Sequence, residues 1–336
     1  MDKERDAILS IHKALGNTDE KEIFETDAQA FTLDGNEYLF STDEYSSEDL
    51  FNESNPKTLG WNLTIATLSD ILAAGGDPLY FSHSMSIPPE WGEKFLFEFS
   101  KGIKKCLDLS GVRFLGGDTG LSHDWKYTGI AIGEKCNSMN RNGASPGDTI
   151  YMTGKVGSGN LQAASNIYGD QMSRDNEIVK MNTEFQYRGK EAAIIRKYAT
   201  SCIDSSDGLL KSLINLVKYN NLGFQVDHLA ILEVGVKVCQ LLRIDPAILF
   251  IGECGEYELV CTIPSSREAE FHKECKAQDI TMNRLGTIKG SQNYILNINN
   301  FALDFFDFDI HARNFSNISD YIIAVKSYLE QSSPPD

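Results

Sequence analysis

The segment Trp61–Ala74 constrains the fold most, because it is long, almost wholly apolar and carries one acid, Asp70. Its length and composition predict a helix, and a helix that is apolar on every side is buried on most sides. Gly75, Gly76 and Pro78 follow it, which predicts that the helix ends there. The rest of the chain must therefore cover this helix on most of its faces.

Asp70 lies inside that apolar segment. An unpaired buried carboxylate costs several kcal/mol, so Asp70 must be paired, hydrogen-bonded or bound to a metal. One alternative is a Lys or Arg partner from elsewhere in the chain. Another is exposure on a narrow polar stripe that Asp70 shares with Asn62 and Ser69. The residues alone leave these interpretations open.

Three other segments place aspartates where an apolar run meets Gly, Ser or Thr. They are Ser41-Thr42-Asp43, Gly116-Gly117-Asp118-Thr119 and Asp204-Ser205-Ser206-Asp207-Gly208. Mg²⁺ is bound through carboxylates together with substrate phosphates, so the set indicates a metal and phosphate site. Plainer explanations are a loop for Asp43, a tight turn for Asp118 and a helix N-cap for Asp207. Arg141 is either a solvated charge or a fork for phosphate oxygens.

Composition narrows the function. A length of 336 residues with 41% hydrophobic content favours two domains. The net charge of −17 makes nucleic acid or an anionic membrane surface a poor main partner. The seven cysteines form no CxxC pair, and no secretory or transit segment is evident, so we expect a cytoplasmic protein. No apolar run approaches 18 residues, so no membrane span is expected.

The pattern along the chain predicts an α+β fold. We expect a loop at 43–54 and a turn-rich domain junction at 137–149, while 157–190 carries few signals. Strands are predicted at 37–42, 79–87, 112–115, 125–133 and 201–204, and again after the turn at 252–255, while 149–153 begins the second half of the chain. Helices are predicted at 61–74, 91–110, 191–198, 208–219 and 321–330.

Taken together and in this order, these segments resemble the aminoimidazole-ribonucleotide synthetase-like superfamily, and within it the thiamine-monophosphate kinase family. The similarity runs from about residue 25 to 263. The matching stretches are Asp27-Ala28, Ser41-Thr42-Asp43, Asn62 to Pro78, Gly116 to Thr119, Arg141 to Gly154, Ile203 to Gly208 and Gly255 to Leu259.

The resemblance implies a two-domain fold and a homodimer. Residues 1–140 would form an N-terminal mixed sheet or half-barrel with helices, which binds ATP and Mg²⁺ and dimerises. Residues 141–336 would form a C-terminal α/β domain that closes the cleft. The γ-phosphate of ATP would pass directly to the phosphate of a small substrate, with no protein nucleophile or base.

Carried over residue by residue, the resemblance implies three groups of site residues. The metal ligands would be Asp27, Thr42, Asp43, Asp70, Asp118, Asp204 and Asp207. Gly117, Asp118, Arg141 and Ser206 would contact ATP. Leu50 and Glu256 would face the substrate.

The chain departs from the family pattern at one acidic position beside Asp27 and at two positions that would face the substrate. Thr26 stands where the family has an acid, Leu50 where it has a His, and the segment 253–259 shifts the acid that would face the acceptor. The acceptor therefore stays open. The alternatives are an ATP-dependent synthetase of the cyclo-ligase type, acting on another small phosphorylated metabolite, and a non-catalytic nucleotide-binding paralogue.

Overall fold

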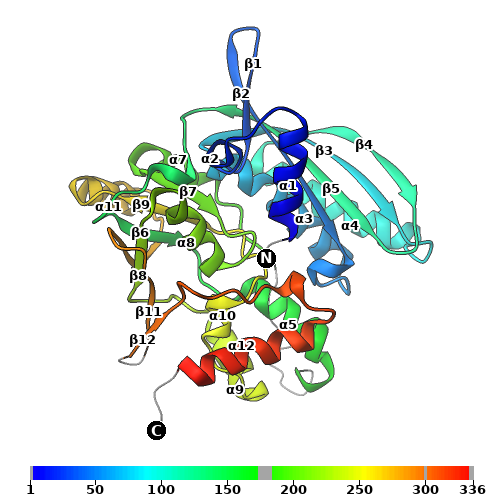
Figure 1. Cartoon of the computed structure of the whole chain (residues 1–336). Helices are drawn as coiled ribbons and strands as arrows, with labels where there is room; N and C mark the ends of the chain where they lie inside the picture. Colours follow the sequence, from blue (N-terminus) through cyan, green and yellow to red (C-terminus); the bar gives the residue numbers. More distant parts are fainter. Residues whose placement is uncertain (1–2, 173–183, 299–300, 333–336) are drawn as a thin grey trace.

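The computed structural model describes residues 3–172, 184–298 and 301–332, which form two sheets with helices around them (Figure 1). The helices are α1 (Lys3–Ala14), α2 (Glu20–Ile23), α3 (Pro56–Ala73), α4 (Glu93–Ser110), α5 (Ser158–Met172), α7 (Gly189–Tyr198), α8 (Leu209–Val217), α9 (Glu233–Leu242), α10 (Ile248–Ile251), α11 (Glu268–Ala277) and α12 (Ile318–Ser332). The strands are β1 (Gln29–Leu33), β2 (Asn36–Ser46), β3 (Gly76–Ile87), β4 (Arg113–Leu121), β5 (Lys126–Lys135), β6 (Thr149–Thr153), β7 (Ser201–Asp204), β8 (Gly223–Val226), β9 (Leu259–Ile263), β10 (Met282–Lys289), β11 (Tyr294–Ile298) and β12 (Phe301–Asp304).

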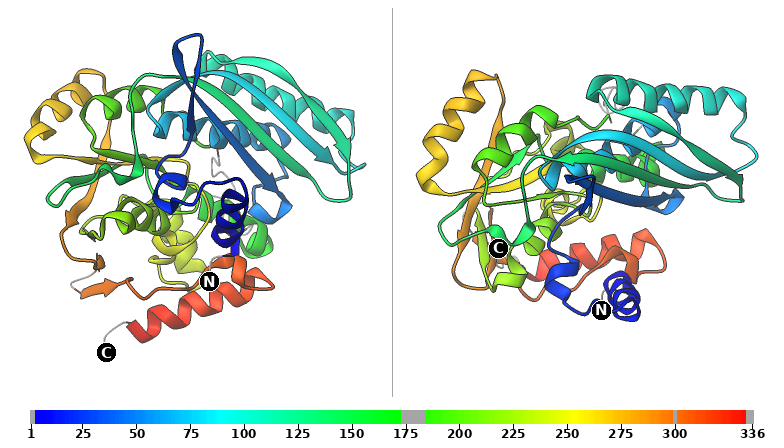
Figure 2. Two further views of the ribbon diagram at one scale, coloured as in Figure 1. Left: turned by 45° about the horizontal axis from the view of Figure 1, so that its top comes forward. Right: turned by 90° about the horizontal axis from the view of Figure 1, so that it is seen from above.

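The first sheet has the strand order β1-β2-β5-β3-β4 and is antiparallel except for the parallel pair β3–β4. Helices α3 and α4 pack against each other, and α3 packs on β2, β3 and β5. Figure 2 shows α4 on one side of this sheet. On the other face, Phe40 and Tyr80 are exposed, and strand β4 is exposed along almost its whole length.

The second sheet has the order β12-β11-β8-β10-β6-β9-β7 and is mixed, because β8 and β11 run parallel. Helices α7 and α11 pack on one face through a core that contains Ile195, Phe271 and Cys261. Helices α8, α10 and α12 pack on the other face, around Phe224 and Phe250. This two-sheet arrangement confirms the predicted α+β class.

Helix α3 lies at the junction of the two sheets, which explains its composition. Thr67 and Ile71 pack against glycines of β5, whereas Leu72 and Ala73 belong to the core shared with α7 and β9. Because neighbours cover it on both sides, every residue from Thr58 to Ala73 is buried. The prediction of an all-round buried helix is confirmed.

The structure corrects three expectations. Strand β2 continues through Asp43 to Ser46, where a loop was expected, because Leu39, Ser41 and Tyr45 alternate inward and the strand pairs with β5 throughout. Strand β4 runs through the glycines at 116 and 117, where a strand end was expected. Any side chain at 117 would collide with His83 on β3, so the glycine permits close strand approach.

The third correction concerns the weakly patterned stretch 157–190. Its first part forms α5, and its last residues begin α7, while 173–183 lie outside the described residues. Within the described ranges, none of the helices has the length and hydropathy required to cross a bilayer.

Candidate metal and phosphate site

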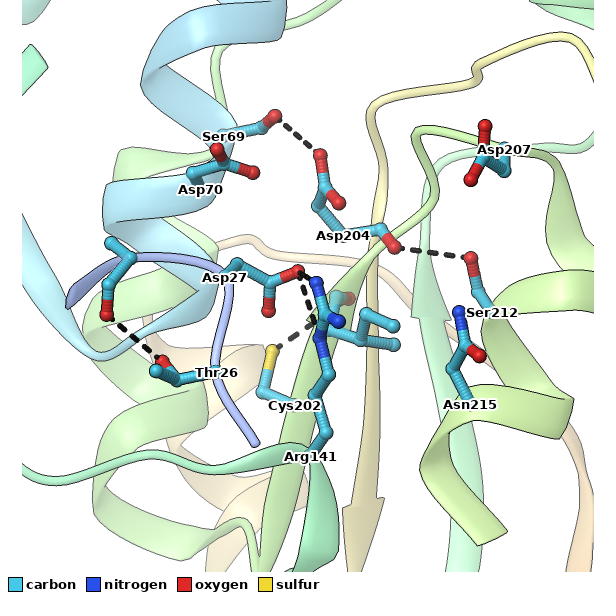
Figure 3. A network of polar contacts seen from close by, with 12 residues as sticks. Thr26, Asp27, Ser69, Asp70, Arg141, Cys202, Asp204, Asp207, Ser212 and Asn215 are labelled. Carbon is cyan, nitrogen blue, oxygen red and sulfur yellow. Dashed lines mark hydrogen bonds and ion pairs between the residues drawn. The ribbon is translucent and has the colours of Figure 1, made fainter. Parts of the chain in front are cut away.

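Three aspartates from distant parts of the chain converge at the junction of the two sheets (Figure 3). Carboxylate oxygens of Asp27, Asp70 and Asp204 all lie within 4.8 Å of one another. Asp27 precedes β1, Asp70 lies in the last turns of α3, and Asp204 ends β7. The first sheet, its helix and the second sheet therefore each contribute one carboxylate.

Neighbouring side chains hold these carboxylates in place. Ser41 donates a hydrogen bond to Asp70 (Oγ–Oδ2, 2.5 Å), and Ser69 donates one to Asp204 (Oγ–Oδ2, 2.6 Å). The Arg141 guanidinium donates through Nε and Nη2 to Oδ1 of Asp27. Both serines directly precede a predicted ligand in the sequence, yet sequence reasoning did not single them out as site residues.

The cluster is electrostatically unfavourable without a further cation. Burial raises the pKa of Asp43 to about 6 and that of Asp204 to about 8, and it raises the pKa of Asp70 well above its ordinary value. Neighbouring carboxylates add to each of these increases. Asp70 is 8% exposed and accepts a hydrogen bond from a hydroxyl, so the exposed stripe is not found, and the residues that the structure describes give Asp70 no basic partner.

The donor set fits Mg²⁺. Asp27 Oδ2 and Asp204 Oδ1 are buried, and within the described residues they have no hydrogen-bond partner. Mg²⁺ takes oxygen ligands at about 2.1 Å in octahedral geometry and usually keeps several waters. A cation among these carboxylates would use the free oxygens and remove the repulsion that burial amplifies.

Asp207 and Ser206 lie beside the cluster, on the loop between β7 and α8. Gly208, with φ of 81°, is the N-cap of α8, so the capping explanation for Asp207 is wrong. Asp207 instead forms an ion pair with Lys211 one turn later (2.9 Å). Its carboxylate is 38% exposed, so it remains accessible to a ligand.

Gly117, Asp118 and the side chain of Thr42 are not brought to the cluster. Thr42 is exposed on β2, on the face opposite Ser41 and Asp43. Asp43 pairs with Gly129, Gly129 with His83, and His83 with Gly117. Three interstrand steps of 4.7–4.9 Å place Gly117 about 14 Å from Asp43. Within one chain, Asp118 is therefore too far away to bind the same ion.

A hollow of about 320 Å³ opens from the cluster between α1, α2 and α8. Its acidic end is lined by Asp27, Asp43, Asp70 and Asp207. The opposite wall carries residues that sequence reasoning did not single out: Arg5, Ile8, His12, Ile23, Phe24, Lys211, Asn215, Lys218 and Tyr219. No local pattern marks them, because they come from the polar N-terminal segment and from one side of an apolar helix.

A second hollow, of about 130 Å³, meets the first at Ser206, Asp207 and Lys211, which line both. Leu50 lines this second hollow, as the family pattern implies for a residue that faces the substrate. Glu256 does not line it. The Glu256 side chain is buried and accepts hydrogen bonds from the N–H groups of Gly157 (2.8 Å) and Gly159 (3.2 Å).

Glu253 occupies the second hollow in place of Glu256. Its carboxylate contacts His311 Nδ1 (2.8 Å) and accepts a hydrogen bond from the N–H of Ala312 (2.7 Å). The hydrogen bond between Glu253 and His311 raises the pKa of His311. Cys254 also lines this hollow, but burial raises the pKa of its thiol to about 12, so the sulfur is a protonated, weak nucleophile. The second hollow therefore contains both acidic and basic groups.

Comparisons with known proteins identify the relatives of this chain. Residues 25–134 match the family model described as AIR synthase related protein, N-terminal domain. The chain is 32% identical to the thiamine-monophosphate kinase of Pyrococcus horikoshii, over 62% of this chain and 66% of that protein. It is 31% identical to the thiamine-monophosphate kinase of Archaeoglobus fulgidus, over 63% of this chain and 68% of that protein. The solved structure of AaThiL complexed with AMPPCP and TMP superposes with a TM-score of 0.75 at 20% identity, covering 89% of this chain and 95% of that one.

Proposed function

Since the chain belongs to the thiamine-monophosphate kinase family, we propose that it transfers the γ-phosphate of ATP to the phosphate of thiamine monophosphate, giving thiamine diphosphate and ADP. The observation that carries this proposal is the position of the carboxylate cluster: Asp27 and Asp70 line the first hollow, and the loop of Ser206 and Asp207 that follows Asp204 lines both hollows. In direct transfer the protein positions the two phosphates and offsets their charge, so no protein nucleophile is needed.

The first hollow is assigned to ATP and the second to the acceptor. Asp27, Asp43, Asp70, Asp204 and Asp207 would hold Mg²⁺, which when bound neutralises the charge of the polyphosphate. Arg141 fixes Asp27 from the side of the C-terminal half. Ser206 faces both hollows, so its hydroxyl can contact the group being transferred.

The second hollow has the charge pattern that thiamine monophosphate requires, an anionic end and a cationic ring. Lys211 lies at the boundary with the first hollow, where the accepting phosphate has to be. Glu48 also lines the second hollow and can offer negative charge to a cationic ring, whereas Asp49 and Glu253 on the same lining already accept hydrogen bonds from Ser46 and from His311 and Ala312. This arrangement favours an acceptor that carries both charges over a purely anionic metabolite.

A second copy of the chain completes the site in this proposal. Strand β4 bears Gly117 and Asp118 together with exposed apolar residues, Phe114 at 46%, Leu115 at 53% and Leu121 at 78%. A long apolar edge strand of this kind favours association. We assign the homodimer to this surface, with Asp118 of the partner subunit reaching the cluster.

The proposal also includes the domain division and the location. The strands of the first sheet lie within 29–135 and those of the second within 149–304, which supports a boundary at 140/141. The seven cysteines are free thiols, which supports a reducing cytoplasmic location.

The metal assignment predicts that ATP stabilises the protein only together with Mg²⁺. A ligand present at one hundred times its Kd adds about 2.7 kcal/mol to the free energy of unfolding. We therefore expect a clear rise in Tm with ATP and Mg²⁺ and a much smaller one with ATP and a chelator. Equal Tm shifts in both conditions would contradict the metal assignment. In a separate assay, release of ADP only when thiamine monophosphate is added would establish the acceptor.

The acceptor assignment makes a separate prediction for Leu50. Leu50→His places a hydrogen-bonding group on the wall of the second hollow, so we expect KM for thiamine monophosphate to fall several-fold while KM for ATP stays constant. Leu109→His, at an exposed position on α4, is the matched control. If only KM for ATP changed, the hollow that Leu50 lines would bind ATP and not the acceptor.

A further inference from the structure

A buried ion pair joins Arg188, directly before α7, to Glu258, directly before β9. The guanidinium donates Nε to Glu258 Oε2 (2.6 Å) and Nη2 to Glu258 Oε1 (2.6 Å), so one fork holds both carboxylate oxygens. Its Nη1 pairs with Glu191 in the first turn of α7 (3.0 Å). Thr153 donates its hydroxyl to Glu258 Oε2 (2.5 Å). The Glu258 carboxylate is therefore held from α7 and from β6 at once.

The main chain of Glu258 is bound in turn to Ser205. The N–H of Glu258 donates to Ser205 Oγ (3.0 Å), and the Ser205 hydroxyl donates to the Glu258 carbonyl (3.0 Å). The Ser205 N–H donates to the same carbonyl (2.9 Å). Ser205 is buried between Asp204 of the carboxylate cluster and the pair Ser206 and Asp207, which lines both hollows (Figure 3 shows both aspartates). The position of Glu258 therefore fixes the segment that carries these site residues.

The ion pair is better suited to fixing a position than to adding stability. Moving two charges out of water has a cost that their attraction returns only in part, so a buried pair is weak evidence for stability. A bidentate fork, however, sets direction as well as distance. Gly154, with φ of 57°, leaves the space for it, because any side chain there would collide with the Glu258 carboxylate and the Arg188 guanidinium.

We propose that Arg188 is a positioning residue for phosphoryl transfer, which acts through Glu258 and Ser205 on the place of Ser206 and Asp207 between the two hollows. This inference rests on the proposed function, because it takes Asp207 as a metal ligand and Ser206 as a contact of the transferred group. Arg188 itself lines neither hollow. A misplacement of about 1 Å, caused far from the reacting atoms, can lower the rate about 10²-fold.

The outer side of Arg188 opens to a third hollow, of about 560 Å³, which has no lining residue in common with the other two. Gly154, Lys155 and Glu191 line this third hollow together with Arg188. Removal of the guanidinium would leave the carboxylates of Glu258 and Glu191 beside a space that a small planar cation can enter. Guanidinium ion from solution can therefore replace the missing group in Arg188→Ala.

The test measures kcat, KM for ATP, and the Mg²⁺ concentration that gives half of the ATP-dependent rise in Tm. Arg188→Lys keeps a charge beside Glu258 but loses the fork. We expect kcat to fall about tenfold or more, KM for ATP at saturating Mg²⁺ to stay within about twofold, and the Mg²⁺ requirement to rise several-fold. Arg188→Ala should lose more activity. Guanidinium chloride, far below the concentration that unfolds the protein, should restore part of it, whereas sodium chloride at the same ionic strength should not.

Arg196→Lys is the matched control. Arg196 lies on the same helix and makes the same kind of fork, to Asp77 on β3 (2.7 Å and 3.0 Å). Its side chain is 19% exposed, compared with 17% for Arg188. This control should leave kcat and the Mg²⁺ requirement unchanged, whatever happens to Tm.

The outcomes separate the inference from the function on which it rests. If Arg188→Lys lowers Tm but keeps the kcat and the Mg²⁺ requirement of the unaltered protein, the ion pair is only structural and the inference is overturned. An equal loss of kcat in Arg196→Lys overturns it too, and so does restoration by sodium chloride. If Arg188→Ala does not fold, Arg188→Lys decides. If the unaltered protein releases no ADP with thiamine monophosphate, the proposed function fails, and the Mg²⁺ requirement of Arg188→Lys and Arg196→Lys still decides the inference.

Discussion

Asp70→Asn is expected to reduce ADP formation by about 10²- to 10³-fold while the protein stays folded. Asp70 is buried and accepts a hydrogen bond from Ser41 (2.5 Å), and burial together with the neighbouring carboxylates raises its pKa. Asn keeps the shape and removes the charge, so in the absence of metal the free energy of unfolding should be unchanged or higher. The measurements are the rate of ADP release under saturating ATP and Mg²⁺ and the Tm of the metal-free protein.

Asp108→Asn is the matched control, because it makes the same chemical change at an exposed position on α4, where Asp108 pairs with Lys104. This control should retain full activity. Full activity of Asp70→Asn would show that the carboxylate is structural and would remove the cluster from the mechanism. A drop in Tm without metal would contradict the account of repulsion among the aspartates.

Mixing two inactive variants is expected to restore about a quarter of the activity, if Asp118 serves the site of the partner subunit. Asp70→Asn and Asp118→Asn should each be inactive alone. In a mixed dimer one site receives both changes and the other receives neither. With half of the dimers mixed, one site in four is complete. Co-expression of the two variants followed by an ADP-release assay measures this fraction.

The control mixes Asp70→Asn with Asp204→Asn. Both residues belong to the same cluster in one chain, so every site in a mixed dimer stays damaged and no activity should return. If activity returned in this control, the recovery could not be attributed to a complete site in a mixed dimer. Absence of recovery with Asp118→Asn would mean that β4 of a second copy does not complete the site.

The buried helix and the carboxylates could be predicted from sequence because each is a local signal. The stretch from Trp61 to Ala74 is apolar on all sides, and burial of Asp70 follows from its neighbours. The similarity to a known family then identified Asp27, which has no distinguishing local context. The structure places Asp27 beside Asp70 and Asp204.

Residues whose role depends on long-range packing could not be predicted. Asp118 looks like a turn residue, and only the pairing of β4 with β3 shows that it lies in a strand remote from the cluster. Glu256 has the right charge for a substrate contact, yet it caps the start of α5. Helices α9 and α11 lie in stretches where no element was predicted, since their short amphipathic patterns are weak compared with the packing that stabilises them.

The loop that carries Ser206 and Asp207 forms a wall common to both hollows. Because the same residues line both hollows, a ligand in one hollow lies next to a ligand in the other, and the two ligands can be joined into one molecule. A compound that connects adenosine through a polyphosphate chain to the phosphate of the acceptor would fill both hollows at once. Linking makes the second contact intramolecular, so such a bisubstrate inhibitor would exceed the affinity of either half by orders of magnitude. The affinity gained at each chain length would then measure the span between the two hollows.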